Sequence, residues 1–152
     1  MPKEKKTLKV RLPLFKTPES EWRKDIHRVV SEALLKKHVH YTTEDYLEIW
    51  ITIYFDESKI RFVDVDNRTK HILDALQGLT KGYGKKTRAL KPLIPNDNQV
   101  YRIIVEKNVA PKQSYGKGHL IIRKYKGDRL STQVGKIALF KKKKHYSQFG
   151  KV

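Results

Sequence analysis

The chain has 152 residues, the length of one ordinary domain with a short extension, and this is enough to bury an apolar core. Its 34 Lys and Arg residues against 16 Asp and Glu give a formal net charge of +18, a self-repelling excess that indicates a polyanionic partner such as nucleic acid. The absence of cysteine excludes disulfides, thiol catalysis and Cys-ligated zinc, and the absence of a long apolar run or a signal-peptide pattern leads us to expect a cytoplasmic protein with no membrane partner.

The first part of the chain has the pattern strand, helix, strand. Apolar and basic or Pro residues alternate over 8–14, which predicts a half-buried strand. Thr17-Pro18-Glu19 predicts a helix start with Thr17 as the N-cap and Pro18 as the first helical residue, and apolar side chains at helical spacing extend the helix to Lys37. A long strand is predicted over 46–55, where every second residue is apolar.

The remainder alternates between the same two kinds of element. Residues 60–63 are expected to be extended and to lead into Asp64, after which a second amphipathic helix ends at Gly78 or Gly82. Residues 79–92 have the composition of a mobile basic loop, and two further strands are predicted over 99–106 and 119–125. We therefore expect an α+β fold, a single domain with a mixed β-sheet packed with two main helices.

Three aspartates stand out among the basic residues. In an extended segment residues two apart point the same way, so Asp64 and Asp66 can converge on one cation, and Mg²⁺ prefers such carboxylate oxygens. Asp97 directly precedes a predicted strand and would reach the same ion if that strand lay beside the segment ending at Val63. The alternative is structural, because Asp before a helix is a common N-cap and Pro-Asn-Asp-Asn is ordinary turn chemistry.

Two linked blocks of sequence resemble the RusA family of Holliday junction resolvases. The first runs from Asp64-Val65-Asp66-Asn67 through Lys70 to Asp74-Ala75-Leu76, and the second is Asn96-Asp97-Asn98-Gln99-Val100. The likeness covers about 61–107, roughly a third of the chain. The sequence departs from the family at Asn96, where a second acid is frequent, in the long basic segment 77–96, and around 13–18, where the family's N-terminal segment is not recognisable.

The resemblance implies a RusA-like fold, a homodimer and a role for each matching residue. It implies that Asp64, Asp66 and Asp97 bind Mg²⁺, with Mn²⁺ as an alternative, and that Lys70 is the catalytic lysine. Asn67 and Gln99 match motif positions that we expect to support the metal ligands without contacting the ion themselves. Asp74 lies four residues after Lys70 and is expected to orient it, although an ordinary surface ion pair of Lys70 with Asp66 or Asp74 would explain the same spacing.

Basic segments outside these blocks are expected to contact the DNA backbone. The DNA-binding candidates are Lys81, Lys85, Lys86 and Arg88 in the loop, and Lys141, Lys142, Lys143 and Lys144 near the C-terminus. The alternative for each run is a solvated charged surface. We therefore divide the chain into a nuclease domain over 1–126, with motif blocks over 61–107 and a basic loop over 79–92, and a basic C-terminal extension over 127–152.

The expected function is that of a Mg²⁺-dependent endodeoxyribonuclease that resolves four-way DNA junctions by paired symmetric nicks, in recombination and repair. No phosphate-binding loop or dinucleotide-binding motif is present, so no small-molecule cofactor is expected. Two alternatives remain open. One is a non-catalytic basic protein that binds nucleic acid, and the other is a nuclease selective for flaps or other branched structures.

Overall fold

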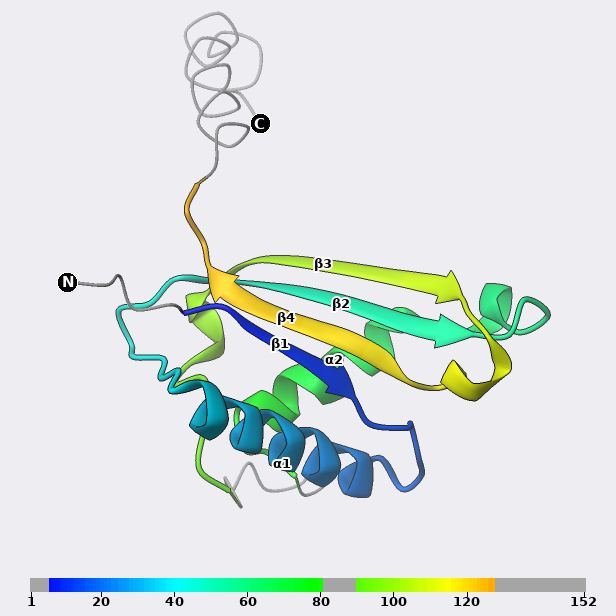
Figure 1. Ribbon diagram of the computed structural model, residues 1–152, viewed down its shortest axis with the longest axis horizontal. Coiled ribbons are helices and arrows are strands. Elements are labelled where there is room, and N and C mark those ends of the chain that lie inside the picture. The colour runs from blue at the N-terminus through cyan, green and yellow to red at the C-terminus, as the bar shows by residue number, and fades with distance from the viewer. Residues whose placement is uncertain (1–5, 81–89, 128–152) are drawn as a thin grey trace, which may run out of the picture.

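A computed structural model describes residues 6–80 and 90–127 of the chain (Figure 1). Its helices and strands follow in the order β1 (Leu8–Leu12), α1 (Glu19–Lys37), β2 (Leu47–Phe55), α2 (Val65–Leu76), β3 (Val100–Val109) and β4 (Gly118–Lys124). Three short 3-10 helices lie between them: η1 (Ile60–Phe62), η2 (Asp97–Gln99) and η3 (Lys112–Ser114). The expected α+β class, with one mixed sheet and two main helices, is confirmed.

The sheet has the strand order β1-β4-β2-β3. β2 runs parallel to β3 and antiparallel to β4, and β4 is antiparallel to β1. Because β2 and β3 are parallel, α2 must carry the chain back along the sheet between them. α2 therefore begins beyond the C-terminal end of β2 and leads back toward the end where β3 begins, as Figure 1 shows.

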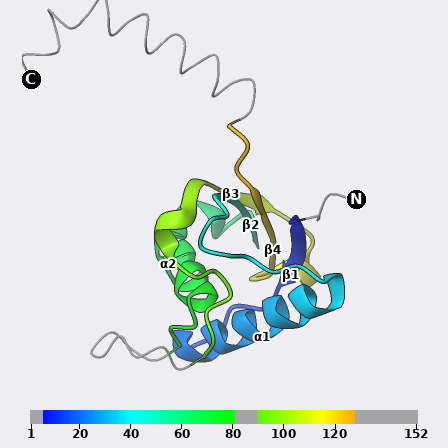
Figure 2. The same ribbon diagram turned by 90° about the vertical axis from the view of Figure 1, so that its left-hand side faces the viewer.

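Both helices pack on the same face of the sheet (Figure 2). The alternation that predicted β2 decides this arrangement, because its apolar residues 47, 49, 51, 53 and 55 are all buried on that face. Trp22, Ile26 and Val30 of α1 and Ile72 and Leu76 of α2 complete the core from the helix side. The opposite face of the sheet carries no helix among the described residues.

Three local expectations differ from the structure. Pro18 is extended, with ψ of 151°, so α1 begins at Glu19 and Thr17 lies one residue too early to cap it. β1 ends at Leu12, and Leu14 is 54% exposed instead of continuing the alternation. Residues 60–62 form the 3-10 helix η1 where an extended segment was expected.

The second helix ends where glycine allows it. Gln77 is the C-cap of α2, and Gly78 follows with φ of 77°, the left-handed conformation that favours glycine. A Cβ at Gly78 would also lie 2.2 Å from the backbone oxygen of Leu90. Of the two predicted helix ends, Gly78 is therefore confirmed. Within residues 6–80 and 90–127, no helix has the length and apolar character needed to cross a membrane.

Candidate active site

Asp64 and Asp66 lie together at the N-terminal end of α2, and both are exposed. Asp64 is the N-cap, because its Oδ1 accepts a hydrogen bond from the Asp66 backbone N–H at 2.9 Å. The structural interpretation of Asp64, as an N-cap, is therefore confirmed. The expectation that both residues belong to one extended segment is wrong, since Asp66 is already helical. Their carboxylates nevertheless share one exposed helix end, where the helix dipole favours negative charge.

Asp97 lies in η2, directly before β3. The strand beside β3 is β2, which ends at Phe55, so the strand pairing that would have brought Asp97 beside Val63 is absent from the described sheet. With about 1.5 Å of rise per residue, the 12 residues of α2 span about 18 Å. Asp64 caps the first end, whereas Leu93 and Ile94, shortly before Asp97, bond to Leu76 at the last turn. Accordingly, the described residues contain no group of three or more His, Asp or Glu side chains arranged to hold a metal ion.

Lys70 and Asp74 occupy the helix between these two ends. Asp66, Lys70 and Asp74 follow one another at intervals of four residues, about one helical turn, so the three share one side of α2. Burial raises the pKa of Asp74 above its ordinary value, the positive charges of Arg23 and Lys70 oppose this, and the nearby carboxylate of Asp97 adds to it. Asp74 also forms an ion pair with Arg23 of α1, with 3.7 Å between Oδ2 and Nη1. Asp74 is therefore near enough to Lys70 and Asp97 to sense their charges, and it forms an ion pair with an arginine that the motif did not indicate.

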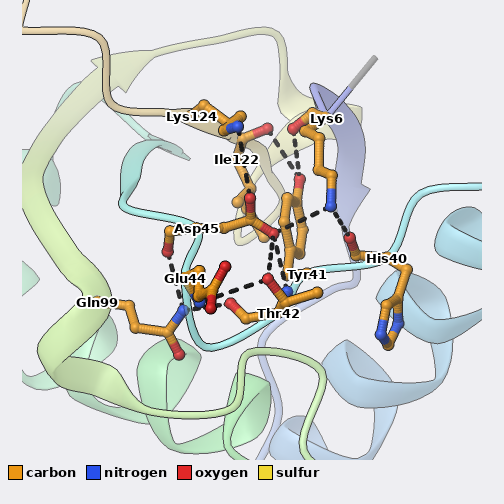
Figure 3. Close-up of polar contacts among 9 residues, drawn as sticks. All are labelled: Lys6, His40, Tyr41, Thr42, Glu44, Asp45, Gln99, Ile122 and Lys124. Atoms are coloured by element: carbon orange, nitrogen blue, oxygen red, sulfur yellow. Dashed lines mark hydrogen bonds and ion pairs between the residues drawn. The ribbon is translucent and has the colours of Figure 1, made fainter. Parts of the chain in front are cut away.

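Gln99 secures the backbone on either side of Asp97. Its buried side chain accepts a hydrogen bond from the Asn96 N–H at 2.9 Å, which completes a capping box around η2. Its amide nitrogen donates to the carbonyl oxygens of Thr42 and Asp45 (Figure 3). Asn67, the other position placed behind the metal ligands, is exposed in the first turn of α2.

The loop before β2, to which Gln99 donates its hydrogen bonds, is organised around the buried carboxylate of Asp45 (Figure 3). Asp45 accepts hydrogen bonds from the Thr42 N–H at 2.8 Å and from Lys6 Nζ at 3.1 Å, and Lys124 Nζ lies 3.6 Å away. Although burial opposes ionisation, these donors hold the pKa of Asp45 below its usual value. This cluster joins the chain just before β1, the end of β4 and the start of β3, and so fixes the position from which Asp97 projects.

Two basic side chains near the start of α2, those of Lys107 and Arg68, were not predicted from the sequence to have a role in this region. Lys107 of β3 donates to the carbonyl oxygens of Ile60 at 2.6 Å and Val63 at 3.1 Å, which ties η1 to the sheet. Arg68 places its guanidinium 3.5 Å from the centroid of the Phe15 ring, and burial lowers the pKa of this group. Arg68 could have been noticed because it lies one turn after Asp64. Lys107 gives no local signal, because its partners lie more than 40 residues earlier in the chain.

The DNA-binding candidates Lys81, Lys85, Lys86, Arg88 and Lys141, Lys142, Lys143 and Lys144 all lie outside the described residues, as does nearly all of the extension over 127–152. A scan against models of known protein families and a search of curated proteins found no match to this chain.

Proposed function

We propose that this protein is a Mg²⁺-dependent endonuclease for branched DNA that acts as a homodimer on four-way junctions. The observation that carries the proposal is the group of charges on α2, where the exposed carboxylate of Asp66 precedes Lys70 by one helical turn and the exposed carboxylate of Asp64 caps the same helix end. The net charge of +18 supplies the general attraction to DNA. The resemblance of the two motif blocks to RusA-family resolvases supports the choice of a branched substrate.

The residues present fit a magnesium ion. Mg²⁺ usually takes one or two protein carboxylates and completes its shell with water and substrate phosphate. Asp64 and Asp66 offer two carboxylates at an exposed position that a DNA phosphate can approach. When bound there, Mg²⁺ would act as a Lewis acid on the scissile phosphate and lower the pKa of the attacking water.

The side chain of Lys70 would supply the remaining charge stabilisation. Lys70 lies one turn after Asp66 on the same side of α2, so its ammonium group would be within reach of a phosphate held at Asp66. Asp74, one turn after Lys70, would help to orient it, and Asp74 is itself paired with Arg23. In this proposal Lys70 would stabilise the negative charge that develops on the phosphate during hydrolysis.

Asp97 needs a second copy of the chain to take part. Within one copy it lies near the end of α2 opposite to Asp64 and Asp66. A two-fold dimer that sets the start of one α2 against the end of the other would place the partner's Asp97 beside Asp64 and Asp66, and would create two equivalent sites. Two equivalent sites are also what paired nicks on opposed strands require.

The test is cleavage of an immobile four-way junction, with linear duplex and flap substrates as controls, in Mg²⁺ and in EDTA. We expect paired symmetric nicks in the junction alone, and only with the metal. Asp66→Asn should abolish cleavage yet preserve or tighten junction binding, because it removes a carboxylate that repels DNA. Glu57→Gln is the matched control, since it removes one exposed negative charge outside the site and should leave cleavage intact.

The rival is a non-catalytic basic protein that binds nucleic acid, which the capping role of Asp64 favours because a helix cap needs no catalytic explanation. Absence of cleavage of all three substrates in both Mg²⁺ and Mn²⁺ would establish the rival and overturn the proposal. Metal-dependent cleavage of the flap in preference to the junction would keep the nuclease and change its substrate.

A further inference from the structure

The sheet face that carries no helix, called the open face below, bears aromatic and basic side chains. The strand register places Lys9 and Arg11 of β1, His119 and Arg123 of β4, Trp50 and Tyr54 of β2, and Arg102 of β3 on this face. None of these seven side chains belongs to the buried core, and the register adds the exposed acid Glu106 and the half-buried Ile104 and Ile121 to the same face. The open face is therefore an accessible surface on the side of the sheet away from α2.

Three tyrosines gather at the end of the sheet where β2 begins and β4 ends. The rings of Tyr46 and Tyr101 are stacked, with centroids 4.6 Å apart and planes inclined by 19°, and Tyr125 lies 5.6 Å from Tyr101. A register shift in the pairing of β2 with β3 leaves Tyr101 without a partner residue. Tyr46 is 51% and Tyr101 55% exposed, so this tyrosine cluster offers ring surface to a ligand.

Arginines continue the row of rings across the open face. The guanidinium of Arg102 lies 5.2 Å from the Tyr125 ring, and that of Arg123 lies 5.2 Å from the Trp50 ring. The buried carboxylate of Glu48 sits between them and forms ion pairs with both. Glu48 thus fixes two planar cations among aromatic rings, an arrangement that combines stacking surfaces with positive charge.

We infer that the open face binds unpaired nucleotides, with bases stacking on the tyrosine cluster and phosphates drawn to the neighbouring arginines. Surfaces that bind single-stranded nucleic acid without sequence preference combine aromatic platforms with basic side chains in this way. The ligand must be unpaired, because the faces of bases in a duplex are already covered by their neighbours. Base-paired DNA would meet the same surface through its phosphates alone.

Charge argues against two other occupants of the open face. A two-fold dimer through this face would bring two surfaces of the same, mainly basic, charge together, and like charges oppose such contact. The sequence over 128–152, which follows immediately after this end of the sheet, contains Lys141, Lys142, Lys143 and Lys144 and a single acid, Asp128. Because its charge has the same sign as that of the open face, the segment 128–152 is not expected to dock there. Both are suited to a polyanion instead.

This binding surface goes beyond the proposed cleavage site and does not depend on it, because the strand register places its arginines on the face of the sheet opposite to the buried core, while Figure 2 shows α2 on the core side. The test is binding of the full chain to a labelled 12-nucleotide oligothymidylate, measured by fluorescence anisotropy in EDTA over a range of salt concentrations. We expect Tyr46→Ala/Tyr101→Ala to weaken this binding about tenfold or more. Because the tyrosines contact bases, the slope of affinity against salt should stay unchanged.

Tyr46→Phe/Tyr101→Phe keeps the rings and should bind like the wild type, and Leu35→Ala, which removes an exposed apolar side chain from α1, is the surface control. Circular dichroism confirms that each variant folds.

Wild-type binding by the alanine double variant overturns the inference, as does an equal loss for fully paired duplex. A shift of the alanine variant from dimer to monomer in sedimentation also overturns it, because the open face would then be an interface between copies. Junction cleavage by the phenylalanine variant reports separately on the proposed nuclease.

Discussion

Lys70 occupies the centre of the charged side of α2, with Asp66 one turn before it and Asp74 one turn after. If Lys70 stabilises charge on the scissile phosphate, Lys70→Met should lower the rate of junction cleavage by about 100- to 1000-fold and leave junction binding nearly unchanged. Single-turnover cleavage with saturating protein measures the rate. Lys36→Met, in the exposed last turn of α1, is the control for the loss of one positive charge. Equal losses in the two variants would show that Lys70 contributes only general attraction.

His71 links the stability of the protein to pH. It is buried, with Nδ1 3.5 Å from Arg23 Nη1, and burial followed by the charges of Arg23 and Lys70 lowers its pKa below 6.5, while Glu19 and Asp74 oppose the shift. The folded state therefore binds the proton less readily than the unfolded state. Stability should fall as pH drops below about 6.5 toward the lowered pKa, and should be insensitive to this group at higher pH.

Urea denaturation between pH 7.5 and pH 5 measures this effect. His71→Asn should remove part of the pH dependence, whatever its effect on stability at pH 7.5. His38→Asn is a matched control, since His38 is exposed with φ of 54°, a conformation that asparagine tolerates. If the two variants lose the same share of the pH dependence, His71 does not produce it.

At the scale of elements, η2 is joined to the loop before β2 by the buried amide of Gln99. Gln99→Ala would leave the Asn96 N–H and the Thr42 and Asp45 carbonyl oxygens without this partner, and should lower the free energy of unfolding by about 1–3 kcal/mol. It should also slow cleavage under conditions where the variant remains folded, because Asp97 begins η2. Gln113→Ala, at an exposed position in η3, should change neither quantity. Slow cleavage without loss of stability would instead indicate direct contact of Gln99 with the site.

The elements themselves were largely predictable, for a local reason. Alternating apolar residues fixed β2 within one residue, and helical spacing did the same for α1. The segment after β2 was not predictable, because η1 is held by Lys107, which reaches Ile60 and Val63 from a strand that comes much later in the chain. A segment whose hydrogen bonds come from distant residues carries little sign of its conformation in its own sequence.

For the whole molecule, the separation of Asp97 from Asp66 allows a test of how the site is assembled. Asp66→Asn and Asp97→Asn should each be inactive alone, but co-expressed chains should form mixed dimers with one intact site, made from Asp66 of one copy and Asp97 of the other. Such dimers should nick one strand of the junction instead of two. Co-expressed Asp64→Asn and Asp66→Asn are the control, since both changes damage the same end of α2 and every site would stay defective. Failure of the first pair to restore nicking would exclude a shared site.

The sequence by itself determined the α+β class, the two helices, the four strands and the set of chemically suited residues, because these depend on the period of apolar side chains and on residue type. It also supplied both interpretations of Asp64, as N-cap and as metal ligand, without deciding between them. Only the tertiary structure decided which residues meet. The parallel pairing of β2 with β3 sends α2 back along the sheet and carries Asp97 away from Asp64 and Asp66, while the same sheet brings Tyr46, Tyr101 and Tyr125 together at one of its ends. Strand order joins residues that are distant in the chain, and no spacing within a local motif encodes it.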